Sequence, residues 1–207
     1  MIIQKTSALI VVDVQNGFID GNLAVLGSQK IIPAINDLID RFDNVILTQD
    51  YHPANHISFY QNHQNRKAFD VITLDYGEQI LWNSHCVQGT SDADFHRDLQ
   101  ATKAQLIIRK GFHANIDSYS AFMEADRQTK TGLAGYLHER KITDLYIVGI
   151  ATDFCVAWTA LDAVDFGFSC TVVLDACMAI DVNDSLAQAK ETMIAQGVQF
   201  SDSKNLF

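Results

Sequence analysis

The chain alternates between short apolar runs and stretches in which apolar residues recur at helical spacing. The apolar runs are rich in β-branched residues, as is typical of strands that are buried on both faces of a parallel sheet. They predict strands at Ala8–Val14, Val45–Thr48, Leu106–Ile108, Leu145–Ile150 and Cys170–Leu174, and a final short strand at Val198–Phe200.

Helices are predicted between these strands, because apolar residues there recur every three or four positions. One helix is expected after Ser28, a short one around Leu133, another over Asp153–Val164 and the last over Leu186–Ile194, with Gly197 as the residue that ends it. Strands that alternate with helices predict a doubly wound α/β fold, in which a mainly parallel β-sheet carries helices on both faces.

Composition narrows the function classes. A chain of 207 residues is long enough for one sizeable core, so a single domain over residues 1–207 is expected. The balance of 15 basic against 25 acidic residues argues against nucleic acid or an anionic membrane as a partner. There is no signal-peptide layout, and the four cysteines form no paired motif, so free thiols in a cytoplasmic protein are expected. The sequence does not distinguish oligomeric states.

One long stretch, His52–His96, has weak periodicity and holds five of the seven histidines. A long irregular segment within a compact domain is usually functional. At the start of this stretch, Asp50-Tyr51-His52 puts a carboxylate and an imidazole two residues apart, and His85 would complete three ligands with positions left open for water or substrate. The spacing alone is a weak signal, since histidine-rich loops are more often merely polar.

Ionisable residues also follow the ends of the predicted strands, where ligands bind in open α/β sheets. These residues are Asp13, Asp50, Lys110 and Cys155, and Asp175 ranks lower because aspartate also favours turns. Each alone is better explained as a helix cap or a solvated charge. Together they supply a base, a cation and a nucleophile.

Cys155 is the candidate nucleophile. It follows a buried strand and falls at the start of a predicted helix, with Thr152 or Asp153 as its N-cap. Unpaired N–H groups in a first helical turn favour the thiolate, so this position predicts a reactive sulfur. The alternative is an inert cysteine, because free cysteines are among the most buried residue types.

Ordered motifs from about Ala8 to Asp175 resemble the nicotinamidase/pyrazinamidase branch of the isochorismatase-like cysteine hydrolases. The segments that carry the resemblance are Asp13–Phe18, Leu23–Val25, Asp50–Phe59, Trp82–Thr90, Lys110–Gly111, Asp117–Phe122 and Gly149–Val156. The resemblance implies a doubly wound fold and a catalytic triad of Asp13, Lys110 and Cys155. It also implies a cis peptide before Ala151, with the backbone N–H groups of Ala151 and Cys155 as the oxyanion hole.

The same resemblance implies one divalent ion, zinc, iron or manganese, held by Asp50, His52 and His85. Family members differ on whether the histidine that corresponds to His56 also binds the metal. Phe18 and Trp82 would sandwich a pyridine ring, although ordinary core packing also explains Phe18.

The activity implied is hydrolysis of nicotinamide, and of pyrazinamide-like aromatic amides, to the acid and ammonia in NAD salvage. The metal would bind the pyridine nitrogen, and a thioester on Cys155 would form while Asp13 moves the protons. Gly17, Asn22 and Asn83 depart from the family pattern, which affects loop conformation and substrate preference rather than the reaction.

Two other readings stay open from the residues. A sister hydrolase acting on an isochorismate-like or carbamoyl compound would have no evident use for the Asp50, His52 and His85 cluster. A non-catalytic binding protein would have no need of intact Asp13, Lys110 and Cys155. A redox protein would favour a resolving cysteine, and none lies nearby in sequence, although Cys86 or Cys177 could approach in space.

Overall fold

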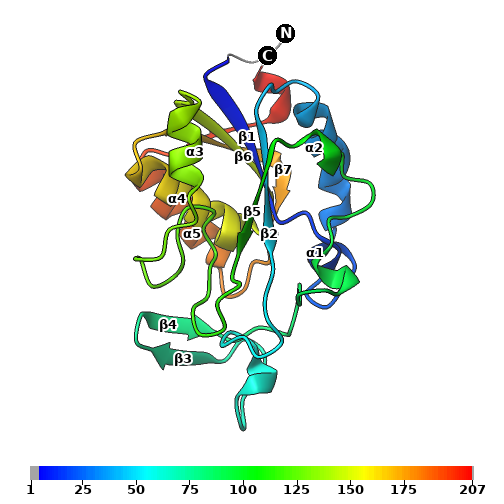
Figure 1. Ribbon diagram of the computed structural model, residues 1–207, viewed down its shortest axis with the longest axis vertical. Helices are drawn as coiled ribbons and strands as arrows, with labels where there is room; N and C mark the ends of the chain where they lie inside the picture. The colour runs from blue at the N-terminus through cyan, green and yellow to red at the C-terminus, as the bar shows by residue number, and fades with distance from the viewer. Residues whose placement is uncertain (1–4, 207) are drawn as a thin grey trace.

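A six-stranded parallel sheet forms the centre of the computed structural model, which describes residues 5–206 (Figure 1). The strands lie in the order β5-β2-β1-β6-β7-β8, and every neighbouring pair is parallel. Their bounds are β1 (Ser7–Val12), β2 (Val45–Asp50), β5 (Leu106–Lys110), β6 (Asp144–Ile150), β7 (Ser169–Met178) and β8 (Gln199–Ser201). Strands β2 and β5 extend the sheet on one side of β1, and β6, β7 and β8 then extend it on the other side. This reversal creates a crevice at the carboxyl ends of the central strands.

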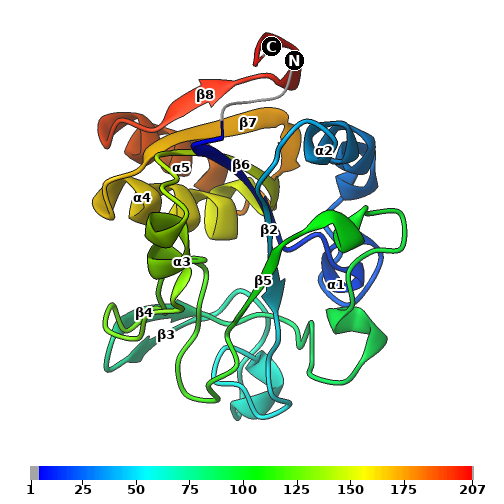
Figure 2. The same cartoon turned by 45° about the horizontal axis from the view of Figure 1, so that its top comes forward.

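Helices cover both faces of this sheet (Figures 1 and 2). Alternate residues of β1 explain the two layers, because Leu9 and Val11 belong to one apolar cluster, whereas Ile10 and Val12 belong to the other. The predicted doubly wound α/β fold is confirmed. The helices of the first cluster's face are α1 (Asn16–Ile19) and α2 (Ile32–Ile39), and those of the second are α3 (Leu133–Glu139), α4 (Ala157–Asp165) and α5 (Ser185–Ala195).

Several predicted boundaries hold and others shift. Gly197 has φ +88° after α5, as expected of the residue that ends a helix. Strand β7 continues past Asp175 to Met178, so Asp175 lies inside a strand rather than at its end. Short 3-10 turns occur at Ser28–Ile31, Tyr60–Asn62, Ser91–Ala93, Ala101–Lys103 and Ser203–Asn205.

The start of α4 differs from the prediction. A π-helical turn over Thr152–Val156 precedes the helix, and neither Thr152 nor Asp153 caps it with a side chain. The Asp153 carboxylate instead accepts hydrogen bonds from the backbone N–H groups of Ile180 and Asp181 and from the Ser185 hydroxyl. The predicted side-chain cap is therefore wrong, because this carboxylate holds a neighbouring loop.

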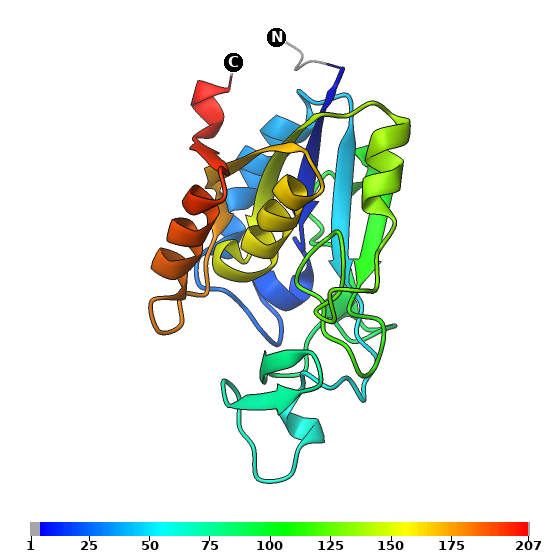
Figure 3. The same cartoon turned by 90° about the vertical axis from the view of Figure 1, so that its left-hand side faces the viewer.

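The irregular segment contains a hairpin that its periodicity did not predict. Strands β3 (Val71–Leu74) and β4 (Gly77–Ile80) pair antiparallel and lie apart from the main sheet, beyond its carboxyl ends (Figure 3). No helix within residues 5–206 combines the length and the apolar character needed to cross a membrane.

Candidate active site

The three predicted catalytic residues meet around a fully buried lysine. Lys110, the last residue of β5, places its Nζ 2.8 Å from Asp13 Oδ2 and 3.4 Å from Cys155 Sγ. The carboxylate and the sulfur lie within 4.8 Å of each other. The same ammonium donates to the Ser118 carbonyl at 3.2 Å and pairs with Asp50. A base, a cation and a nucleophile therefore lie close together in one buried site.

Asp13 is held from the neighbouring strand by Thr48, a residue that the sequence did not single out. The Thr48 hydroxyl donates to Asp13 Oδ1 at 2.6 Å and accepts from the Asp13 backbone N–H at 3.1 Å. Thr48 lies two residues before Asp50 on β2, so its side chain leaves the strand on the same face. This spacing of two residues from Asp50 is the feature of the sequence that could have identified Thr48.

The charges at this point follow from burial and from Lys110. Burial raises the pKa of Cys155 well above its usual value, and Lys110 opposes that rise. Burial also raises the pKa of Asp13, again against Lys110. Burial would lower the pKa of Lys110, but Asp13 and Asp50 raise it well above its usual value. Burial therefore opposes ionisation of the sulfur, whereas Lys110 favours it.

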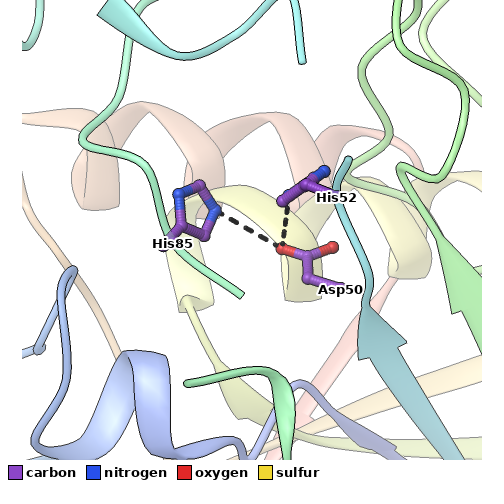
Figure 4. A group of neighbouring side chains, drawn as sticks. All are labelled: Asp50, His52 and His85. Carbon is purple, nitrogen blue, oxygen red and sulfur yellow. Dashed lines mark ion pairs between the residues drawn. The ribbon is translucent and has the colours of Figure 1, made fainter. Parts of the chain in front are cut away.

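The predicted metal ligands also converge (Figure 4). Asp50 Oδ2 lies 3.5 Å from His52 Nε2 and 3.7 Å from His85 Nε2. The other oxygen, Oδ1, pairs with Lys110. Burial would raise the pKa of Asp50, but Lys110, and after it His52, hold that pKa well below its usual range. One ionised carboxylate thus connects the metal ligands to the triad.

The histidine tautomers fit a divalent cation. His52 Nδ1 is 2.8 Å from the Gly111 carbonyl oxygen, and His85 Nδ1 is 2.7 Å from that of Asn83. A carbonyl oxygen only accepts, so each Nδ1 carries a hydrogen, and Nε2, the nitrogen that faces Asp50, is the one that could bind a metal. Two imidazole nitrogens and one carboxylate oxygen are a donor set that suits zinc, iron or manganese.

His56 is oriented differently. Its Nε2 lies 3.1 Å from the Ile116 carbonyl and so donates to it, while its Nδ1 accepts from the Ser58 hydroxyl at 2.7 Å. Burial lowers the pKa of His56 to about 4. Both ring nitrogens are hydrogen-bonded, and the ring lies 4.3 Å from that of His52 between centroids. His56 also forms a second group of possible metal ligands with His52 and Asp117.

A small pocket opens onto both groups. Phe18 and Trp82, the predicted ring-binding residues, are almost fully buried and line it together with Ala151 and Cys155. The Ile150–Ala151 peptide is cis, as the family resemblance implied. The residues that line this pocket without a role assigned from the sequence are Leu23, Asp117, Tyr119, Phe154 and Ile180.

One departure from the family pattern, Gly17 in place of the usual acidic residue, has a local explanation. A Cβ at Gly17 would lie 2.7 Å from Cys86 Sγ and 2.8 Å from a carboxylate oxygen of Asp92. The same carboxylate accepts from the backbone N–H groups of Asn22 and Cys86, at 3.1 and 2.7 Å. Asp92 thus fills the space beside residue 17, where the family pattern has an acidic side chain.

Known proteins resemble this chain over nearly its whole length. A nicotinamidase of Acinetobacter baylyi is 64% identical over 200 residues, which cover 96% of this chain and 94% of that protein. The solved structure of an Acinetobacter baumanii nicotinamidase pyrazinamidease is 62% identical with a TM-score of 0.98 and covers 99% of this chain and 100% of that one.

A pyrazinamidase of Pyrococcus horikoshii, solved in complex with zinc, is 34% identical with a TM-score of 0.78 and covers 95% of this chain and 99% of that one. The family model described as the isochorismatase domain matches residues 7–205. The fold, the convergent site and this match agree, and the chain therefore belongs to the isochorismatase family.

Proposed function

We propose that this protein is a nicotinamidase, which hydrolyses nicotinamide to nicotinate and ammonia in NAD salvage and also accepts pyrazinamide-like aromatic amides. The proposal is carried by one observation: Lys110 Nζ stands 2.8 Å from Asp13 and 3.4 Å from Cys155, and also pairs with a carboxylate that two imidazoles face. The 64% identity to the Acinetobacter baylyi nicotinamidase supports the same substrate.

In the first half of the reaction, Cys155 attacks the carboxamide carbon. The sulfur–carbon bond forms as Asp13 takes the thiol proton, and the carbonyl electron pair moves onto oxygen. The backbone N–H groups of Ala151 and Cys155 would stabilise that oxyanion, and losing one such donor typically costs about 3–4 kcal/mol. Asp13 then returns the proton to nitrogen, and the carbon–nitrogen bond breaks. Ammonia departs, and the acyl group remains on Cys155 as a thioester.

In the second half, water releases the acid. Asp13 takes a proton from the water while the water oxygen bonds to the thioester carbon. The carbon–sulfur bond then breaks, and Asp13 returns the proton to sulfur, which restores the Cys155 thiol. Lys110 remains charged throughout, because two carboxylates raise its pKa. Its ammonium therefore keeps Asp13 ionised enough to accept protons, and it stabilises negative charge as that develops on sulfur.

Asp50, His52 and His85 would hold one divalent ion, for which the zinc in the Pyrococcus horikoshii neighbour is a precedent. When bound, that ion supplies a Lewis-acidic contact for the ring nitrogen of the substrate. Phe18 and Trp82 would bind the faces of the ring, which directs the carboxamide toward Cys155 and lowers the entropic part of the barrier.

The rest of the proposal concerns the whole chain. Residues 1–207 would act as one catalytic domain, with a small aromatic amide as its partner. A cytoplasmic location is consistent with the four cysteines, which are all unpaired and buried.

The direct test is ammonia release from nicotinamide, measured for the wild-type protein with and without a chelator. Turnover is expected, together with its loss after chelation and its return on adding zinc, iron or manganese. Cys155→Ala should abolish turnover and still bind nicotinate, while Cys170→Ala, a buried cysteine outside the pocket, should stay active. Activity of Cys155→Ala would overturn the covalent mechanism.

A trapping experiment tests the thioester itself. Hydroxylamine should compete with water for the acyl group and divert product to the hydroxamate. If release of nicotinate continued with no hydroxamate formed, direct attack by water on the amide would be favoured instead.

A further inference from the structure

The β3–β4 hairpin places one buried polar side chain behind the substrate pocket. Gln79 is 2% exposed, whereas the other strand residues of β3 and β4 are exposed or half-buried. The hairpin lies beyond the carboxyl ends of the main sheet (Figure 3), and the chain continues from it to Trp82, which lines the pocket. A buried amide needs hydrogen-bond partners, so those of Gln79 show what the hairpin holds.

The partners of Gln79 form a closed ring of hydrogen bonds. Its Nε2 donates to Asp117 Oδ2 at 2.7 Å, and its Oε1 accepts from the Tyr76 hydroxyl at 3.0 Å. The Tyr76 oxygen in turn accepts from the Asp117 backbone N–H at 3.3 Å. The direction of each bond is fixed, because a carboxylate can only accept. Two hairpin side chains therefore hold residue 117 by its backbone and by its carboxylate.

Further contacts connect this ring of hydrogen bonds to Tyr119 and Trp82, two aromatic residues of the pocket. Gln79 Nε2 also donates to the Ile80 carbonyl at 2.7 Å and lies 3.3 Å from the Tyr119 hydroxyl. That hydroxyl oxygen accepts from Trp82 Nε1 at 3.0 Å. Asp117, Tyr119 and Trp82 all line the pocket, whereas Gln79 does not. The amide thus stands one residue behind three pocket residues and touches no reacting group.

We propose that Gln79 is a positioning residue for substrate binding, which holds Asp117, Tyr119 and Trp82 in place as one wall of the pocket. This inference rests on the proposed function, because it names a determinant of ring binding. Asp13, Lys110 and Cys155 are carried by the main sheet and the turn after it, so loss of Gln79 affects binding of the ring rather than the bond-making steps.

Steady-state kinetics with nicotinamide test the split between binding and chemistry. Gln79→Leu removes the amide at similar volume and is expected to raise KM and the Kd for nicotinate about tenfold, with kcat changed by less than about threefold. A residue with a merely structural role would instead lower the active fraction, and so kcat, at unchanged KM. The matched control is Glu78→Gln, on the exposed side of the same strand, which should change neither constant.

An NMR measurement reports on the surroundings of Trp82 in this wall and does not depend on turnover. The chain has two tryptophans, so the indole ¹⁵N–¹H spectrum should hold two signals, which Trp158→Phe assigns. Gln79→Leu should shift the Trp82 signal, because the oxygen that accepts its hydrogen bond loses a partner. If Gln79→Leu does not fold, Tyr76→Phe removes the hydroxyl that holds Gln79 and should raise KM about threefold.

A folded Gln79→Leu variant with KM, Kd and the Trp82 signal all unchanged would overturn the positioning role. The proposed function fails separately, if the wild-type protein releases no ammonia from aromatic amides. In that case the Trp82 signal still decides whether Gln79 positions the wall.

Discussion

Thr48 is a buried residue that touches the proposed base and does not line the substrate pocket. It exchanges two hydrogen bonds with Asp13, at 2.6 and 3.1 Å. Thr48→Val keeps the shape and removes both. A hydrogen bond to an ionised group contributes about 1.5–3 kcal/mol, so kcat/KM is expected to fall about 10- to 100-fold. The Kd for nicotinate should not change, and equilibrium binding beside steady-state kinetics measures both.

A second threonine separates this effect from lost stability. Thr159 is equally buried and accepts the Ala121 N–H at 3.0 Å, away from the pocket. Thr159→Val should keep kcat/KM within about threefold of wild type. An equal loss in both variants would show that Thr48 acts through folding and not through the placement of Asp13.

Gly111 allows the backbone to approach the ring of His52. It has φ +62°, and an added Cβ would overlap that imidazole, whose Nδ1 donates to the Gly111 carbonyl. Gly111→Ala should therefore displace a proposed metal ligand and lower metal affinity about 10- to 100-fold, the usual range when a ligand loses its supporting contact. Metal content after dialysis against a weak chelator measures it.

Gly167 provides the matched control for this substitution. It has φ +88°, and an added Cβ would meet no atom within 4 Å. Gly167→Ala therefore carries the backbone cost of a positive φ, about 1 kcal/mol or more, without a steric contact. Metal retention in Gly111→Ala equal to that in Gly167→Ala would contradict the role given to the close approach.

At the scale of elements, Asp153 ties the loop after β7 to the turn that carries Cys155. Its carboxylate accepts from the N–H groups of Ile180 and Asp181, at 3.1 and 2.8 Å, and from the Ser185 hydroxyl. Ile180 lines the pocket. Asp153→Ala should release this loop, so faster amide hydrogen exchange is expected over residues 179–186, with a higher KM for nicotinamide.

The control for that variant is a carboxylate with the same kind of partners elsewhere. Asp175 accepts from the backbone N–H of Ser203 at 2.8 Å and from its hydroxyl at 2.6 Å. Asp175→Ala should speed exchange near residue 203 and leave residues 179–186 and KM as in wild type. Faster exchange at 179–186 in both variants would indicate a global loss of stability.

The elements that could be predicted from sequence are those whose residues are buried on a regular period. Strands β1 and β6 are continuous apolar runs because both of their faces are covered. The β3–β4 hairpin was not predicted, since its side chains are mostly exposed and alternate only weakly. The π-helical turn at Cys155 was also missed, because a helical apolar pattern does not distinguish it from the first turn of α4.

The same limit applies to the site. Asp13, Asp50, Lys110 and Cys155 could be chosen because strand ends meet at one edge of a parallel sheet. The partners of Gln79 could not, because its bonds to Asp117 and Tyr119 span about 40 residues and depend on how the hairpin lies against the body. Local pattern predicts where a side chain leaves the backbone, and long-range packing decides what it touches.

For the whole molecule, the strand order explains why one residue of the site lies at or just beyond the carboxyl end of each of four strands. The neighbours β5, β2, β1 and β6 deliver Lys110, Asp50, Asp13 and Cys155 in that spatial order. After β5 the chain returns to the centre of the sheet to form β6. This return brings Cys155 next to Asp13, although the two residues are 142 positions apart in the sequence. The reversal of strand order thus assembles the triad.

The buried thiols make the stability of the whole fold sensitive to alkaline pH. Burial raises the pKa values of Cys170 and Cys177 to about 12 each. In the unfolded chain these thiols ionise near pH 9, so between pH 9 and 12 the folded state binds more protons than the unfolded state. The free energy of unfolding must therefore fall as pH rises through this window, by about 2 kcal/mol per thiol at pH 10.5 relative to pH 7.

Urea unfolding at pH 7 and pH 10.5 measures this decline in the wild-type protein and in Cys170→Ala/Cys177→Ala. The double variant starts lower at pH 7, because it loses buried side-chain atoms. Its decline with pH should nevertheless be smaller than that of the wild type by about 4 kcal/mol, since neither position can ionise. Equal declines would mean that the folded core does not hold the two thiols neutral. Other groups, such as the half-buried Tyr76 with its pKa of about 12, would then carry the alkaline sensitivity.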